Sequence, residues 1–102
     1  MDGACNRAYY AMFDAARAAL IVSGAPSDQA ARTHSGLIAA FGLHLVKAGC
    51  LSADLGRALN RAAEVRLVAD YTGEEIPADQ ARLVVDQAAQ FVETVSREIM
   101  QS

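Results

Sequence analysis

Apolar residues return along this chain at spacings of three and four, which is the period of an amphipathic α-helix. The pattern predicts four helical segments, residues 4–22, 33–48, 52–70 and 77–100. The first segment stacks four apolar residues on one face: Tyr9, Phe13, Ala16 and Leu20. The last has the longest apolar stripe: Ala81, Val84, Ala88, Phe91, Val95 and Ile99. No stretch shows the period of two that predicts a β-strand.

Capping and breaking residues lie between these segments. Thr33 and Ser52 have side-chain oxygens suited to helix N-caps, and Gly49 is placed to end the second segment. The stretch SGAPSD ends the first segment, and Pro77 suits the first turn of the last. Short connections favour antiparallel neighbours, so we expect an all-α, up-and-down bundle of about four helices in one domain, residues 1–102.

Composition narrows the classes of function. The formal net charge of −3 gives no basic footprint for non-specific binding to duplex nucleic acid. No apolar run approaches the roughly 20 residues of a membrane span, and the first residues do not resemble a signal peptide. Cys5 and Cys50 read as reduced thiols, and His34 and His44 lack neighbouring ligands. We therefore expect a cytoplasmic protein with no membrane partner, no metal and no cofactor.

Arg66 is the sharpest anomaly, because it continues the apolar stripe that Leu59 and Ala62 set on the third segment. A guanidinium facing a core needs partners, since an unpaired buried charge costs several kcal/mol. Asp70 lies one helical turn further on, and Tyr71 follows it. One interpretation is a structural ion pair at a helix end. The other is a polar cluster in a cleft, with Arg66 directed at a phosphate.

The first segment holds a second set of candidates. Arg7, Tyr10, Asp14 and Arg17 follow the helical period on a face next to the apolar stripe. This face is either solvated, with local ion pairs, or part of a site with Arg66. His34, at the start of the second segment, is interpreted as a hydrogen-bonded surface residue.

Three motifs in order, NRAYYAMFDAARAAL, THSGLIAAFGLHLVKAG and EVRLVADY, resemble the HEPN domain family, in particular its short stand-alone prokaryotic members. The resemblance covers essentially the whole chain from Asn6 onward. It implies a helical bundle that pairs into a homodimer and binds nucleotide or RNA. It also implies a minimal nucleotidyltransferase as partner protein, in a toxin–antitoxin-like system.

Ribonuclease members of that family carry an arginine, a polar residue and, a few residues later, a histidine. Arg66 matches the arginine, but Leu67 takes the polar position and Asp70 and Tyr71 stand where the histidine is expected. The resemblance thus favours binding of a nucleotide or RNA phosphate through Arg7, Tyr10, Arg66 and Tyr71. Two alternatives stay open: a metal-independent toxin-type endoribonuclease using Arg66 and Asp70, and a purely structural assembly subunit.

Relatives in this family usually carry a further helix before the segment that begins here at Asn6. The bundle is therefore expected to lack the usual first helix and to leave apolar surface uncovered. Covering such a surface by association gains about 25 cal/mol per Å² of apolar area. We expect a homodimer or a larger homo-oligomer.

Overall fold

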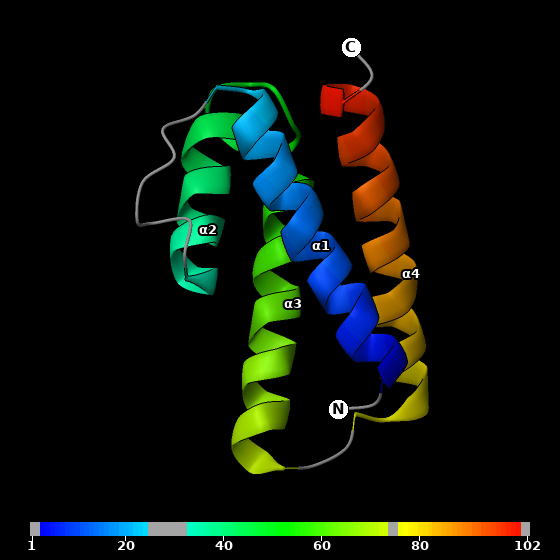
Figure 1. Cartoon of the computed structure of the whole chain (residues 1–102). Helices are drawn as coiled ribbons and strands as arrows, with labels where there is room; N and C mark the ends of the chain where they lie inside the picture. The colour runs from blue at the N-terminus through cyan, green and yellow to red at the C-terminus, as the bar shows by residue number, and fades with distance from the viewer. Residues whose placement is uncertain (1–2, 25–32, 74–75, 101–102) are drawn as a thin grey trace.

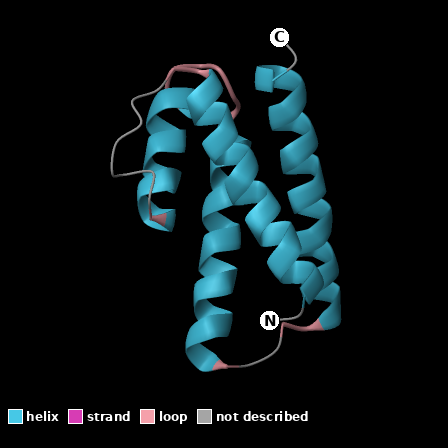
Figure 2. Cartoon of the chain, viewed as in Figure 1, coloured by secondary structure: helices cyan, strands magenta, loops and turns pink. Residues whose placement is uncertain are grey.

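The computed structural model describes residues 3–24, 33–73 and 76–100, and every regular element in these ranges is helical (Figures 1 and 2). Helix α1 spans Gly3–Val22 and α3 spans Ala53–Thr72. Helix α2, His34–Phe41, continues into the π-helical turn η2, Gly42–Val46. Helix α4, Ala78–Val95, likewise continues into the π-helical turn η3, Ser96–Met100. The predicted all-α bundle is confirmed.

Local signals explain most of the helix boundaries. The Thr33 hydroxyl accepts a hydrogen bond from the Gly36 amide at 2.9 Å and so caps the start of α2. Gly73 ends α3 in the left-handed conformation that glycine adopts without strain, with φ of 71°. This stop lies past Asp70, where the sequence pattern predicted the end. Pro77 precedes the first residue of α4 rather than lying in its first turn.

Helices α2, α3 and α4 alternate in direction, as an up-and-down bundle requires (Figure 1). Helix α1 differs, because it runs in the same general direction as α4 and packs more extensively against α4 than against any other helix. The contact of the Cys5 thiol with the Ala81 carbonyl brings the starts of these two helices together. Residues 25–32, which include Pro26, lie outside the described residues.

The core lies where α1 crosses the other helices. Its aromatic side chains are all buried: Tyr9, Phe13, Phe41 and Phe91. The whole predicted stripe of α1 belongs to this core. Its burial supplies most of the driving force for folding, since apolar surface removed from water contributes about 25 cal/mol per Å². No helix within the described ranges is long and apolar enough to cross a membrane.

Candidate functional site

The guanidinium of Arg66 lies against two tyrosine rings of α1. Its Cζ atom is 5.0 Å from the ring centroid of Tyr9 and 4.8 Å from that of Tyr10. Nη2 also donates a hydrogen bond of 2.7 Å to the Tyr10 hydroxyl. A cation over an aromatic face gains about 0.5–2 kcal/mol, which offsets part of the cost of removing Arg66 from water. The arginine on the apolar stripe therefore packs against aromatic rings rather than aliphatic side chains.

The remaining donors of Arg66 are less completely satisfied. Nε lies 3.4 Å from Oδ2 of Asp70, one helical turn further along α3. The Asp70 side chain is 58% exposed, against 21% for Arg66, so water competes for this ion pair. Nη1 is buried and makes no hydrogen bond within the described part of the chain. A buried donor without an acceptor is costly, so the arrangement leaves Arg66 with unused binding capacity.

Tyr9 and Tyr10 are neighbours in sequence, but their environments differ. Tyr9 is buried and packs on Phe13, with ring centroids 4.7 Å apart. Burial raises the pKa of the Tyr9 hydroxyl to about 12, although the positive charge of Arg66 acts in the opposite direction. Tyr10 is 46% exposed and meets Tyr9 edge to face. Tyr9 is thus a neutral side chain in the wall of the site, and Tyr10 is the solvent-facing hydrogen-bond partner of Arg66.

His34 is a member of this site that the sequence interpretation missed. Its ring stacks on Phe13, with centroids 4.4 Å apart and planes inclined by 21°, and lies 5.9 Å from the Tyr9 ring. Partial burial lowers the pKa of His34 from its ordinary value, and the positive charges of Arg66 and Arg17 lower it further. The imidazole is therefore neutral at neutral pH. The sequence did contain one signal for this position: His34 shares a helix face with Ile38 and Phe41, which face the core.

Four of these side chains line one pocket of about 460 Å³ between α1, α2 and α3: Tyr9, His34, Arg66 and Asp70. Its polar lining consists of Tyr9, His34, Ser35, Asn60, Glu64, Arg66 and Asp70. Its apolar lining consists of Ile38, Ala63 and Leu67. We call this the Arg66 pocket. Among the described residues, it combines one cation, one imidazole and two carboxylates with an apolar wall.

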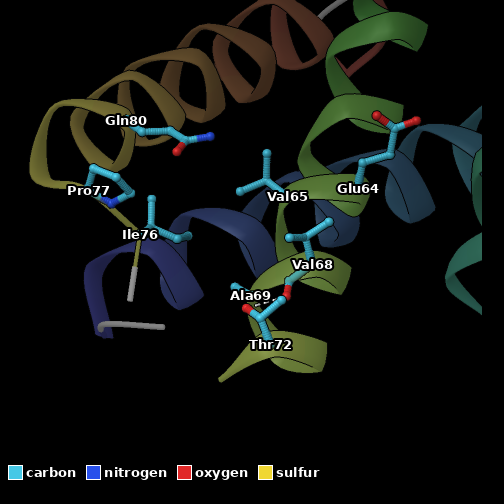
Figure 3. A pocket seen from close by; sticks show the side chains of 8 residues that line it. All are labelled: Glu64, Val65, Val68, Ala69, Thr72, Ile76, Pro77 and Gln80. Atoms are coloured by element: carbon cyan, nitrogen blue, oxygen red, sulfur yellow. Dashed lines mark hydrogen bonds between the residues drawn. The ribbon is translucent and has the colours of Figure 1, made fainter. Parts of the chain in front are cut away.

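A second pocket, of about 340 Å³, lies on the other side of α3 and has a different character (Figure 3). Figure 3 shows Val65 and Val68 of α3 across from Ile76, Pro77 and Gln80. The Thr72 hydroxyl is occupied locally, because it donates to the Val68 carbonyl at 2.9 Å. The described side chains that line this second pocket include no cation. The Arg66 pocket is therefore the better candidate for binding an anion.

The predicted site residues do not all lie together in the structure. Tyr10, Arg66 and Asp70 come together through the contacts described above. Arg7 is exposed and lines a different groove, between α1 and α4. Tyr71 is 88% exposed and does not line the Arg66 pocket. Among the described residues, no group of three or more His, Cys, Asp or Glu side chains could hold a metal ion.

Comparison with known proteins identifies several relatives of this chain. The chain is 37% identical to a UPF0332 protein of Gloeobacter violaceus, over 90% of this chain and 71% of that protein. It is 31% identical to a Methanocaldococcus jannaschii protein named "Putative toxin MJ0605", over 92% of this chain and 67% of that protein. A UPF0332 protein of Thermotoga maritima is 33% identical, over 95% of this chain and 71% of its own length. No solved structure matches the chain.

A family profile described as "HEPN domain" matches residues 1–99. This span includes all four α-helices and every residue of the Arg66 pocket. The resemblance drawn from three separate motifs is thereby confirmed, and the chain belongs to the HEPN domain family.

Proposed function

We propose that this HEPN protein binds the phosphate of a nucleotide or of RNA in the Arg66 pocket. The observation that carries the proposal is the guanidinium itself, which lies against two tyrosine rings and whose Nη1 has no acceptor among the described residues. Arginine suits this ligand, since its planar fork can donate two hydrogen bonds to one phosphate. The flanking apolar wall and Tyr10 offer surfaces on which a base can stack.

The Arg66–Asp70 pair is the contact that a phosphate would replace. Because Asp70 is mostly exposed, the pair contributes only about 0–1 kcal/mol and breaks at small cost. Release of Asp70 would free Nε of Arg66 for a hydrogen bond to the phosphate. Asp70 and Glu64 line the same pocket and repel an anion. They would therefore reduce affinity and disfavour binding of anions that do not engage Arg66 directly.

The relatives support a toxin-type setting for this binding. One of them carries the word toxin in its name, and the family resemblance implies a minimal nucleotidyltransferase as partner protein. We extend to this chain a role as partner of such an enzyme in a toxin–antitoxin-like system. Tyr71 is exposed, so a partner protein can reach it. Its part in ligand binding, like that of Arg7, belongs to this proposal.

The groove between α1 and α4 supports association with a second copy of the chain. It encloses about 700 Å³ and is lined by small apolar residues: Ala8, Ala11, Val85, Ala88, Ala89 and Val92. Arg7 and Glu93 line the same groove. Opposite charges on one patch allow it to pair with itself about a twofold axis, which is the commonest symmetry of homodimers. Arg7 would then pair with an acidic residue of the other copy.

The test of phosphate binding compares Arg66→Ala with Arg61→Ala. Arg61 is an exposed arginine of the same helix and lies outside the Arg66 pocket, so both variants lose one positive charge. Binding of adenine nucleotides and of a short single-stranded RNA is measured by calorimetry. We expect Arg66→Ala to lose about tenfold or more in affinity and Arg61→Ala to stay near wild type. Equal affinity of wild type and Arg66→Ala would refute the proposal.

A further inference from the structure

The lining of the Arg66 pocket changes in character across the surface of α3. Successive residues of an α-helix are rotated by about 100°, so their order around the helix follows from their numbers. The α3 residues that line the pocket begin with the cation and its ion-pair partner, continue with two apolar side chains and end with an amide and a carboxylate: Arg66, Asp70, Ala63, Leu67, Asn60 and Glu64. The pocket therefore has a cationic edge, an apolar floor and a polar edge.

Asn60 and Glu64 form the polar edge and are neighbours there, because residues four apart lie on the same face of a helix. Both residues are exposed, and neither side chain makes a hydrogen bond or an ion pair with another described residue. Figure 3 shows the Glu64 carboxylate directed away from Ile76 and Pro77, which line the second pocket. An amide and a carboxylate with unused hydrogen-bonding capacity thus lie across the floor from the guanidinium of Arg66.

We propose that the Arg66 pocket selects guanine among the nucleobases, and that Glu64 is the residue that recognises the base. This inference rests on the proposed binding of a nucleotide phosphate by Arg66. The two edges of the pocket lie on opposite flanks of α3, and a helix with its side chains is about 10–12 Å wide. A nucleotide whose phosphate is bound by Arg66 is long enough to bring its base to Glu64.

The hydrogen-bonding capacity of a carboxylate points to guanine. A carboxylate has two acceptor oxygens and no donor, so its best partner is a group with two parallel N–H donors. Guanine offers this pair on its Watson–Crick edge, from N1–H and the 2-amino group, and its 6-oxo group can accept a hydrogen bond from the Asn60 amide. Adenine and cytosine place a ring acceptor beside their amino group, and uracil flanks its N–H with two carbonyl oxygens. Each of these three bases would set an acceptor against Glu64.

The apolar floor supports the same placement of the base. Leu67 is 69% exposed although it lies between the two polar edges, and Ala63 and Ile38 line the pocket with it. A base that reaches from the phosphate to the carboxylate covers this floor and removes its apolar surface from water. The floor accepts every base alike, so it adds affinity without selectivity. Selectivity therefore comes from Glu64.

The experiment compares GMP with IMP by calorimetry, because these nucleotides differ only in the 2-amino group of the base. Wild type should bind GMP about tenfold more tightly than IMP, since IMP leaves one carboxylate oxygen of Glu64 without a donor. AMP, which has neither of the two donors, should bind no more tightly than IMP. Glu64→Gln should bring GMP and IMP to nearly equal affinity, because an amide has only one acceptor oxygen. A preference for GMP that survives in Glu64→Gln overturns the inference.

Glu98→Gln is the matched control for the loss of charge. Glu98 pairs with Arg97 on η3 and lies outside the Arg66 pocket, so each variant loses one negative charge but only one of them changes the polar edge. A change of net charge shifts the affinity for all these nucleotides together, so the ratio of the GMP and IMP affinities is the quantity to compare. Glu98→Gln should keep the wild-type ratio. A ratio that falls equally in both variants also overturns the inference.

Two further outcomes separate this inference from the binding proposal. Equal affinity of wild type for GMP and IMP, lost for both in Arg66→Ala, overturns the selection of guanine and leaves the binding of phosphate standing. Nucleotide affinity that is insensitive to Arg66→Ala overturns both.

Discussion

The two pockets beside the second half of α3 share a helix and the residue Glu64, yet they differ in what they can bind. The pocket of Figure 3 is walled by Val65, Val68 and Ile76, and its described lining contains no cation. The Arg66 pocket is lined by the Tyr9 ring, a guanidinium and an imidazole. An aliphatic wall packs without polar partners, whereas a half-buried arginine is held at a cost in desolvation. Stability alone therefore gives little reason for Arg66, and ligand binding gives a good one.

The largest expected effect comes from removing the aromatic wall of the Arg66 pocket. Tyr9→Ala deletes a buried ring that packs on Phe13 and supports Arg66, and should destabilise the fold by about 3–5 kcal/mol. Val68→Ala, on the aliphatic side, changes a side chain that is 60% exposed and should stay within about 0.5 kcal/mol of wild type. Denaturant unfolding measures both. Similar losses in the two variants would contradict the contrast between the walls.

Arg66→Met should separate binding from stability. Methionine fills a similar volume without a charge, so the free energy of unfolding should stay within about 1 kcal/mol of wild type or rise. RNA affinity should fall about tenfold or more, because the phosphate loses its ligand. Thermal unfolding and calorimetric titration of the same samples give both quantities. A variant that is much less stable but binds RNA normally would make Arg66 a structural residue.

Asp70→Asn should strengthen phosphate binding. The substitution removes a negative charge from the pocket and frees the guanidinium of Arg66, so affinity should rise about two- to fivefold. Asp54→Asn is the matched control, since Asp54 pairs with Arg57 on the same helix away from the Arg66 pocket. The nucleotide titration used for Arg66 measures both variants. Equal gains in both would reduce the effect to net charge, and weaker binding by Asp70→Asn would place the carboxylate among the ligand contacts.

The smallest effect is a dependence of stability on pH that arises from His34. The folded protein lowers the pKa of His34 below its ordinary 6.5, so the unfolded chain takes up a proton first as the pH falls. Stability should therefore decrease as the pH falls below about 6.5 and level off below the folded pKa. Among the described residues, the charged groups facing this ring are Arg17, Glu64, Arg66 and Asp70.

The contribution of His34 to the pH dependence of stability can be isolated by measuring unfolding curves at a series of pH values around 6.5. The three proteins to compare are wild type, His34→Gln and His44→Gln. His34→Gln should lack this contribution, and His44→Gln, on the same helical segment, should retain it. The contribution would instead belong to other groups if it survived unchanged in His34→Gln.

Much of the fold followed from local pattern. The period of apolar residues predicted all four helices, and the stripe of α1 lies in the core as expected. The pairing of Arg66 with Asp70 was also within reach, since residues four apart on a helix are neighbours. The π-helical turns η2 and η3 were not predicted, because a shift from four-residue to five-residue hydrogen bonds leaves no clear signal in the apolar pattern.

The candidate site was predictable only in part. The sequence pattern singled out Tyr10 on a polar helix face and Arg66 on an apolar stripe. In the structure, a hydrogen bond joins these two side chains. Arg7, on the same face of α1 by period, lies in the α1–α4 groove instead. A helical wheel places residues on a face but does not say which helix covers each end of that face. Arg7 precedes Tyr10 by nearly one turn, and this displacement brings it beside α4 rather than α3.

The sequence by itself determined the helices, their inward faces and the presence of an arginine where a core residue was expected. These features depend on contacts between residues three or four apart, which the chain order specifies directly. Only the tertiary structure decided that His34 meets Arg66 across Tyr9, because that contact depends on how α2 docks against α1 and α3. Helix docking is set by the packing of many side chains at once, so no short motif encodes it. The same docking put an imidazole beside Arg66 although none follows it along α3.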